Sequence, residues 1–167
     1  MLKPLLSLLS VFAFTVTSSF ADKKVAVPSA KLSDFKVGEA ITGPAVDLSN
    51  TGGKGVVIEA WGVHCGPCLA SLPHIEQLAS RNKSDTIFVG AHSQAASDDE
   101  VKAVVKKNRL SYGIVKGVRG PVSFDGIPHA FVFDPAGTLI FSGSPFDKDF
   151  ETAVRKAGRP LASAGTK

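Results

Sequence analysis

The chain has 167 residues but only two cysteines, one methionine and one tryptophan. Two cysteines cannot build the disulfide framework of a small secreted scaffold. The 16 glycines follow no Gly-X-Y period, which excludes a collagen-like chain. The net charge of +4 comes without a run of Lys and Arg, so we expect no nucleic-acid partner. With 44% hydrophobic and 20% charged residues, the composition excludes intrinsic disorder and favours one globular domain.

The first 21 residues differ from the rest of the chain. Lys3 supplies a positive charge, residues 5–16 are mostly apolar, and Ser19-Phe20-Ala21 ends in small residues. This order of regions is typical of a secretory signal peptide, and the apolar run is short for a transmembrane span. We therefore expect an exported, periplasmic chain that begins at Asp22 after cleavage near Ala21, in a compartment where cysteines can be oxidised. A retained N-terminal anchor is the alternative.

Strand and helix patterns alternate along the remaining residues. Short apolar or β-branched runs predict strands at residues 45–48, 56–60, 86–91, 112–115, 130–133 and 138–141. Helical spacing and capping residues predict helices at residues 68–81, 98–109 and 145–157. Pro73 is expected to kink the first helix, and Asp134-Pro135-Ala136-Gly137 is typical of a hairpin turn. Ser144 and Pro145 fit the start of the last helix, with Phe146 on its buried face.

This alternation, closed by a hairpin, predicts an α/β fold with a mixed central sheet flanked by helices. No internal repeat or low-complexity block interrupts it. The expected organisation is an N-terminal arm at residues 22–44, the domain at residues 45–158 and a flexible tail at residues 159–167.

The chemistry is concentrated in the segment Trp61-Gly62-Val63-His64-Cys65-Gly66-Pro67-Cys68, between a buried strand and an amphipathic helix. Unpaired N–H groups and the helix dipole at the start of that helix stabilise a thiolate at Cys65. Cys68 follows one turn later, within reach of the first sulfur. Gly66-Pro67 permits the tight turn and presets the backbone of the first helical turn. Such a pair can switch between dithiol and disulfide with little backbone movement.

These residues resemble the thioredoxin superfamily. The matching features are Trp61, the Cys-Gly-Pro-Cys motif, Pro73 five residues after its second cysteine, and Ile127-Pro128 where the family has a cis-proline. Glu59 stands six residues before Cys65, where thioredoxins carry a buried acid. The arm and an extra helix–strand segment between residues 86 and 126 make the chain similar to the exported TlpA/ResA branch.

The resemblance implies a thioredoxin-like fold and a thiol–disulfide oxidoreductase without a cofactor or metal, in a branch of which several members serve cytochrome c maturation. Cys65 would attack a disulfide in a protein substrate, Cys68 would resolve the mixed disulfide, and Glu59 would take the proton of Cys68 through a water. The expected substrate-binding residues are Trp61, His64, Gly66, Pro67, Ile127, Pro128 and His129. Because the periplasm is oxidising, a membrane thiol electron donor would be needed to reduce the cysteine pair again after each reaction. We expect a monomer.

Two residues depart from the family pattern. His64 replaces the usual aromatic residue before the first cysteine, and Glu59 replaces the Asn common in the TlpA/ResA branch. His64 could be a plain exposed residue or, when protonated, could stabilise the Cys65 thiolate. Glu59 could pair with a lysine at a sheet edge, and Trp61 could be a packing residue.

Other residues also have plainer interpretations. The two cysteines could be half of a zinc site, although further ligands at suitable spacing are lacking. Pro128 could be an ordinary trans proline. His74, His92 and the acidic run at residues 98–100 are assigned to the surface or to helix capping.

Two other functions use the same motif. A disulfide oxidase or isomerase would run the same chemistry in the other direction, and its reduction potential would distinguish it. A copper-binding module would use Cys65, Cys68 and His64 or His129. The lack of methionine after residue 21 argues against copper, because Cu(I) selects soft sulfur ligands. The Gly66-Pro67 spacer is that of thioredoxin, with a potential of about −270 mV, so we predict a reductant.

Overall fold

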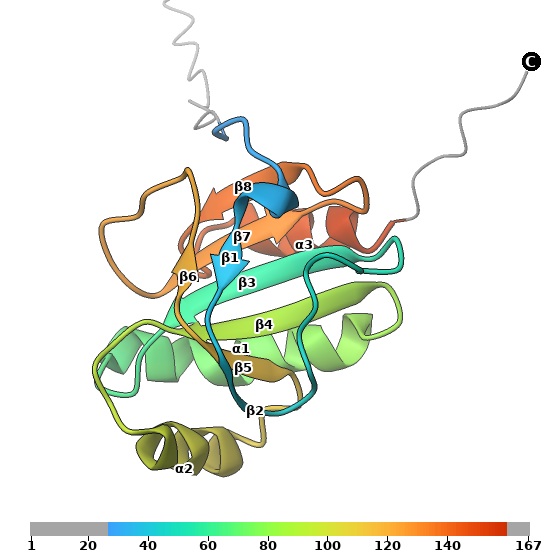
Figure 1. Ribbon diagram of the computed structural model, residues 1–167. Helices are drawn as coiled ribbons and strands as arrows, with labels where there is room; N and C mark the ends of the chain where they lie inside the picture. The colour runs from blue at the N-terminus through green and yellow to red at the C-terminus, as the bar shows by residue number, and fades with distance from the viewer. Residues whose placement is uncertain (1–26, 160–167) are drawn as a thin grey trace, which may run out of the picture.

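The structure is a computed structural model that describes residues 27–159. The predicted signal peptide with its cleavage site and nearly all of the predicted tail lie outside the described residues. A six-stranded mixed sheet forms the centre of the described part (Figure 1). In spatial order its strands are β2 (Ala40–Thr42), β5 (Gly113–Lys116), β4 (Thr86–His92), β3 (Gly55–Trp61), β7 (His129–Phe133) and β8 (Leu139–Gly143). Strands β3, β4 and β5 run parallel, and the other three run antiparallel to their neighbours.

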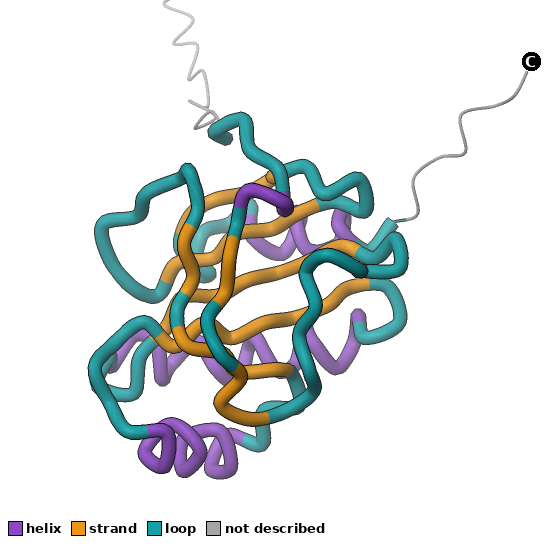
Figure 2. Tube along the Cα trace, in the orientation of Figure 1, coloured by secondary structure: helices purple, strands orange, loops and turns teal. Residues whose placement is uncertain are grey.

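The remaining elements lie on the two faces of this sheet and beside one of its edges. They are the helices α1 (Gly66–Asn82), α2 (Asp98–Asn108) and α3 (Phe150–Ala157), the 3-10 turn η1 (Leu32–Asp34), and the two-stranded ribbon of β1 (Lys36–Val37) and β6 (Val118–Arg119). Helices α1 and α3 lie behind the sheet in Figure 1, and the N-terminal segment crosses its front. Helix α2 lies beside the edge formed by β5 and β2 (Figure 2). The arrangement confirms the predicted mixed sheet flanked by helices.

We call the side of the sheet covered by α1 and α3 the helix face, and the side crossed by residues 27–48 the arm face. Side chains alternate between the faces along each strand. On β3, Val57 and Trp61 join the helix-face core, whereas Val56 and Ile58 join the arm-face core. The arm-face core is closed by Phe35, whose ring centroid lies 5.1 Å from that of Phe131. Each side of the central strand is therefore fully covered, which explains why its sequence is apolar except for Glu59.

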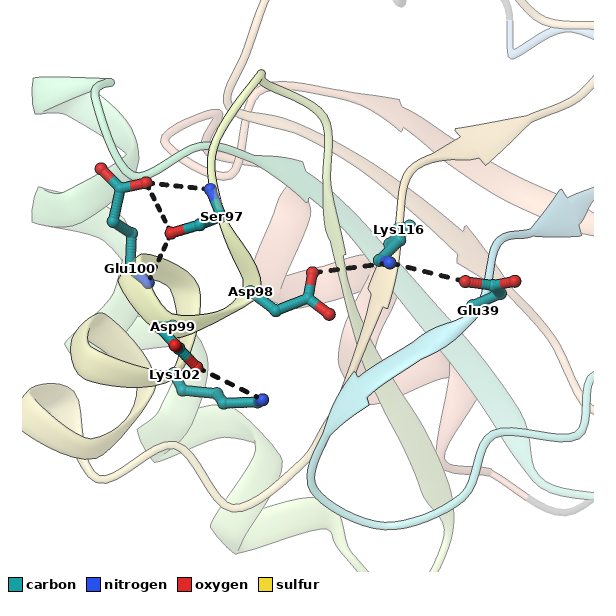
Figure 3. Close-up of polar contacts among 7 residues, drawn as sticks. All are labelled: Glu39, Ser97, Asp98, Asp99, Glu100, Lys102 and Lys116. Atoms are coloured by element: carbon teal, nitrogen blue, oxygen red, sulfur yellow. Dashed lines mark hydrogen bonds and ion pairs between the residues drawn. The ribbon is translucent and has the colours of Figure 1, made fainter.

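Helix boundaries follow the capping chemistry in the sequence. The N-cap of α1 is Cys65, and Pro73 lies inside this helix. Ser97 and Glu100 form the predicted capping box of α2, and Arg109 ends that helix in the left-handed conformation, with φ of 55°. Lys116 on β5 joins the start of α2 to the sheet edge, because its Nζ lies 3.5 Å from Asp98 Oδ1 and 3.4 Å from Glu39 Oε2 (Figure 3).

The prediction of the last helix start was wrong. Helix α3 begins at Phe150 with Asp149 as N-cap, not at Ser144-Pro145. Ser144 instead closes a turn, in which its Oγ accepts from Phe146 N–H at 3.2 Å and its N–H donates to Asp147 Oδ2 at 3.0 Å. These local hydrogen bonds compete with helix formation. Phe146 is consequently 59% exposed instead of buried.

The predicted strand at residues 45–48 is also absent; this segment is a loop. The edge of β5 is already occupied, because Ala40 pairs with Val115 and Thr42 with Ile114. Strand β2 therefore comes from the segment predicted to be an arm, and the sheet extends across the expected boundary at residue 45.

Candidate active site

The two cysteines lie at the start of α1 and are joined by a disulfide, with their Cα atoms 5.2 Å apart. Cys68 is completely buried, whereas Cys65 retains 9% of its surface. The backbone N–H of Cys68 donates to Cys65 Sγ at 3.2 Å. The positive end of the helix is thus directed at the first sulfur, which is the arrangement that stabilises a thiolate there.

Glu59 lies on β3 beneath this helix start and is 1% exposed. Burial raises its pKa from 4.5 to about 7, and a hydrogen bond from Ser71 opposes that rise. Ser71 Oγ lies 2.8 Å from Glu59 Oε1 and also 2.8 Å from the carbonyl oxygen of Cys68. A serine hydroxyl has one hydrogen and cannot donate to both acceptors. If Glu59 is protonated, it can donate to Ser71 Oγ while Ser71 donates to Cys68, so the contacts fit a carboxylic acid.

Ser71 was not among the residues expected from the sequence. It is buried on α1, three residues after Cys68 and four before Ile75. Helical spacing therefore places it on the apolar face of the helix. A serine in that position was the available signal, because a buried hydroxyl needs a polar partner.

Trp61 lies on the same face of β3 as Glu59 and is completely buried. Its ring packs edge-on against His92, with centroids 5.3 Å apart. A Cβ at Gly90 would lie 3.0 Å from Trp61 Nε1 and 3.1 Å from Tyr112 Cε2, so the glycine leaves room for both rings. Trp61 packs beneath the site and offers no surface for the expected contact with a substrate.

Three polar atoms in this part of the core find no hydrogen-bond partner among residues 27–159. They are Glu59 Oε2, Trp61 Nε1 and the hydroxyl of Tyr112. Burial, followed by the charges of Glu59 and Glu76, raises the pKa of Tyr112, so its phenol stays neutral. Unpaired polar groups of this kind reduce stability and are concentrated at functional sites.

The segment that precedes Cys65 is held by the end of β4 and the residues that follow it. Ser93 N–H donates to the Trp61 carbonyl at 2.8 Å, Val63 N–H donates to His92 Nε2 at 3.3 Å, and His64 N–H donates to Gln94 Oε1 at 3.0 Å. His92 was expected at the surface but is 6% exposed, because β4 continues one residue beyond the predicted strand.

The pKa of His92 is lowered, chiefly by burial and then by the nearby His64, while Asp98 and Glu100 oppose the shift. A lowered pKa agrees with the hydrogen bond, because Nε2 of His92 can accept from Val63 N–H only when that nitrogen carries no proton. His92 is therefore a neutral support of the segment before Cys65.

Ile127-Pro128 forms a cis peptide bond, as the family resemblance implied. The carbonyl oxygen of Ile127 lies 3.6 Å from Cys65 Sγ. No hydrogen is available on a disulfide sulfur, so this is a contact; the reduced thiol could donate to the same oxygen. The structure thus brings together Cys65, Cys68, Ile127 and Pro128, with Gly66 and Pro67 exposed beside them.

The side chains of the two remaining expected residues make their contacts with groups other than the sulfurs. The His64 side chain is 62% exposed, and its Nε2 lies 3.9 Å from Glu100 Oε1 on α2. His129 lies at the start of β7, where its ring stacks on Phe124 at 5.1 Å and its Nε2 lies 2.9 Å from Ser142 Oγ. These contacts place His129 on the arm face with Phe131, on the other side of the sheet from the cysteines.

The described residues, 27–159, contain neither a metal cluster nor a membrane-spanning helix. Among them, no three His, Cys, Asp or Glu side chains cluster closely enough to hold a metal ion. None of the helices in this part of the chain has both the length and the apolar character needed to cross a membrane.

A family model described as Redoxin matches residues 22–148. A curated relative from Bacillus cereus, thiol-disulfide oxidoreductase ResA, is 28% identical over 141 residues, which cover 81% of each chain. The protein of the same name from Halalkalibacterium halodurans is 31% identical over 115 residues, which cover 66% of this chain and 65% of the relative.

Solved structures show the same fold. The thioredoxin domain of a thiol-disulfide oxidoreductase from Bacteroides vulgatus superposes with a TM-score of 0.63 at 16% identity, covering 80% of this chain and all of that one. A secreted Mycobacterium tuberculosis disulfide oxidoreductase, described as homologous to Escherichia coli DsbE, gives a TM-score of 0.56 at 22% identity, with coverage of 74% and 96%.

Proposed function

Because this chain belongs to the Redoxin family and is a thiol–disulfide oxidoreductase of the thioredoxin superfamily, similar to ResA, we propose that it is exported and reduces disulfides in protein substrates. The observation that carries this proposal is the unequal burial of the cysteine pair at the start of α1. Cys65 retains exposed surface and its Sγ accepts a hydrogen bond from the Cys68 N–H, whereas Cys68 is completely buried. This inequality supports distinct roles for the two sulfurs.

In the proposed reaction the Cys65 thiolate attacks one sulfur of the substrate disulfide. A mixed disulfide forms, and the other substrate sulfur leaves as a thiolate. Cys68 then loses its proton and attacks Cys65 Sγ, which releases the second substrate thiolate and forms the Cys65–Cys68 disulfide. Two electrons pass from the protein to the substrate. The ionised form of Glu59, acting through a water, is the proposed acceptor of the Cys68 proton, since a pKa of about 7 leaves part of the carboxyl ionised near neutral pH.

The half-buried segment Ile127-Pro128 beside Cys65 is the proposed docking site for an extended substrate segment. Ile127 and Pro128 would pair with that segment through main-chain hydrogen bonds, and Gly66, Pro67 and His64 would border it. The buried position of Trp61 and the arm-face position of His129 do not support a substrate contact by either residue.

The proposal that the protein acts as a reductant depends on the Gly66-Pro67 spacer and on the position of His64. This histidine is mostly exposed and faces the carboxylate of Glu100, so solvent and a negative charge weaken its effect on Cys65. We expect a potential near the −270 mV of thioredoxin, measured by equilibration with glutathione. A potential near the roughly −120 mV of DsbA would instead favour the oxidase or isomerase.

We also propose the setting in which the reaction occurs. The monomeric protein would be exported, and its mature chain would begin at Asp22. A membrane thiol donor would reduce the disulfide again after each cycle, because an oxidising compartment supplies no reductant. The proposed substrates are disulfides in proteins that take part in cytochrome c maturation. The intact mass of exported protein tests the processing step; a chain that still carries Met1 would contradict cleavage.

A trapping experiment tests the proposed roles of the cysteines. Cys68→Ala should accumulate mixed disulfides with substrate proteins, because the second step is removed. Cys65→Ala is the matched control and should trap far fewer. In the reduced wild-type protein Cys65 should alkylate before Cys68. Equal trapping by the two variants, or equal alkylation rates at neutral pH, would contradict the assignment.

A further inference from the structure

The segment between β3 and Cys65 has no regular structure of its own, yet it fixes the position of the first cysteine. The N–H of Cys65 donates to the Gly62 carbonyl at 3.3 Å, and His64 is covalently joined to Cys65. The placement of the sulfur at the start of α1 therefore depends on what holds Gly62 and His64.

A single side chain contacts both residues. Gln94 accepts the His64 N–H with its Oε1 at 3.0 Å. Its carboxamide also fills the space beside Gly62, where a Cβ would overlap Oε1 and Cδ of Gln94. Glycine at position 62 leaves room for the amide of Gln94, which a side chain there would have to displace.

We propose that Gln94 is a positioning residue for thiol–disulfide exchange, which holds Gly62 by packing and His64 by a hydrogen bond so that Cys65 stays aligned with the N–H groups of α1. The inference rests on the proposed role of Cys65 as the attacking thiol. Gln94 acts through Gly62 and His64 and not through either sulfur.

Gln94 lies on the segment that joins β4 to α2. Residues 92–94 bond to the segment at Trp61, Val63 and His64, and the capping box of α2 begins three residues later at Ser97. Lys116 ties the start of α2 to the sheet edge (Figure 3). The residues on both sides of Gln94 are therefore held: His92 and Ser93 bond to the segment before Cys65, and Ser97 caps the start of α2.

The expected consequence is chemical as well as structural. With Gln94→Ala, the segment before Cys65 gains freedom, and the thiolate loses part of its alignment with the helix N-terminus. The pH midpoint for alkylation of Cys65 in the reduced protein should rise by about half a unit to one unit, so that the rate at pH 6 falls about threefold to tenfold. Ser93→Ala is the matched control, because its hydroxyl bonds only to the Ala91 carbonyl among the described residues.

A double-mutant cycle separates this role from simple destabilisation. Gly62→Ala should displace the Gln94 amide and thereby slow alkylation as Gln94→Ala does. In the Gln94→Ala background the same Gly62→Ala change should have little further effect, because the overlapping amide is gone. A loss of thermal stability with an unchanged alkylation midpoint would overturn the proposal, as would fully additive effects of the two substitutions.

The same data distinguish failure of the proposal from failure of the proposed function. If Cys65 is not the attacking thiol, the reduced wild-type protein alkylates first at Cys68. If only the role of Gln94 is wrong, wild-type Cys65 still alkylates first and Gln94→Ala keeps the wild-type midpoint.

Discussion

The two faces of the central sheet bury different kinds of side chain. On the arm face, the buried cluster around Phe35, Phe131 and Phe133 is entirely apolar. The helix face contains the buried polar residues Glu59, Ser71, Thr86 and His92, together with the cysteine pair. The four buried polar side-chain atoms without a partner among the described residues are also there: Glu59 Oε2, Trp61 Nε1, Thr86 Oγ1 and Tyr112 Oη.

This difference indicates that the arm face mainly stabilises the fold, whereas the helix face carries the functional groups. Burial of apolar surface without polar groups is the dominant stabilising contribution to a fold. A buried carboxyl and unpaired donors reduce stability, and such groups are retained at functional sites. The apolar burial on the arm face therefore offsets the loss of stability caused by the buried polar groups on the helix face. Substitutions on the arm face should mainly change stability, whereas substitutions on the helix face should also change the chemistry of the site.

The largest expected effect is a loss of stability caused by a substitution on the arm face. Phe131→Ala removes a ring that packs against Phe35 and should lower the free energy of unfolding by about 3–5 kcal/mol. The reduction potential should stay within about 30 mV of wild type, because no group near the cysteines changes. Guanidinium unfolding of the oxidised protein and equilibration with glutathione measure the two quantities. If Phe131→Ala is unfolded, Phe131→Leu serves the same comparison with a smaller loss. A large shift of potential in a folded variant would show that the faces are not independent.

The second largest effect is expected for a substitution of Glu59 on the helix face, whose influence on stability should depend on pH. The folded protein keeps the Glu59 proton up to a pKa of about 7, whereas the unfolded chain releases it near 4.5, so stability falls as the pH rises between these values. Glu59→Gln has no such proton. Its advantage over wild type should grow across this window to about 3 kcal/mol above pH 7.

Unfolding curves at pH 4.5 and pH 8 test this dependence, and Asp99→Asn, whose side chain on α2 is 95% exposed, is the control. The same Glu59→Gln variant should resolve the mixed disulfide more slowly while its first attack stays near the wild-type rate. A stability difference that is equal at both pH values, with both steps unchanged, would reduce Glu59 to a packing residue.

The smallest effect is expected at the exposed edge of the site. His64→Trp removes a residue that is mostly in solvent and faces Glu100. The reduction potential should change by no more than about 30 mV, which corresponds to about 1.4 kcal/mol for this two-electron couple. Equilibration with glutathione at pH 6 and pH 8 measures it. A much larger negative shift would identify His64 as a determinant of the potential.

The sequence was sufficient for those parts of the site that depend on spacing along the chain. Cys65, Cys68 and Glu59 belong to one strand–turn–helix unit, so short-range patterns place them together. The prediction of Ile127-Pro128 required a family pattern, because no local signal distinguishes a cis bond from the common trans form.

Residues whose neighbours are determined by strand register could not be placed from patterns along the sequence. His92 lies beside Trp61 because the two strands pair in parallel with these residues in register. Gln94 contacts Gly62 only because the chain continues past the end of that strand. At the last helix, Ser144-Pro145 has the composition of a helix start, but Asp147 captures the Ser144 N–H and closes a turn instead. Such competition between local hydrogen bonds is decided by three-dimensional context.

The pairing of β2 with β5 has a consequence for the order in which the chain can fold. Thr42 pairs with Ile114, so roughly 70 residues of chain separate partners that are neighbours in the sheet. Contacts at such separation carry a large loop-closure entropy and form slowly. During synthesis β2 is made before any other strand of the six-stranded sheet, yet it has no partner until β5 has been made. Strand β2 is therefore the first strand of this sheet to be synthesised, but it cannot join the sheet before β5 has been made.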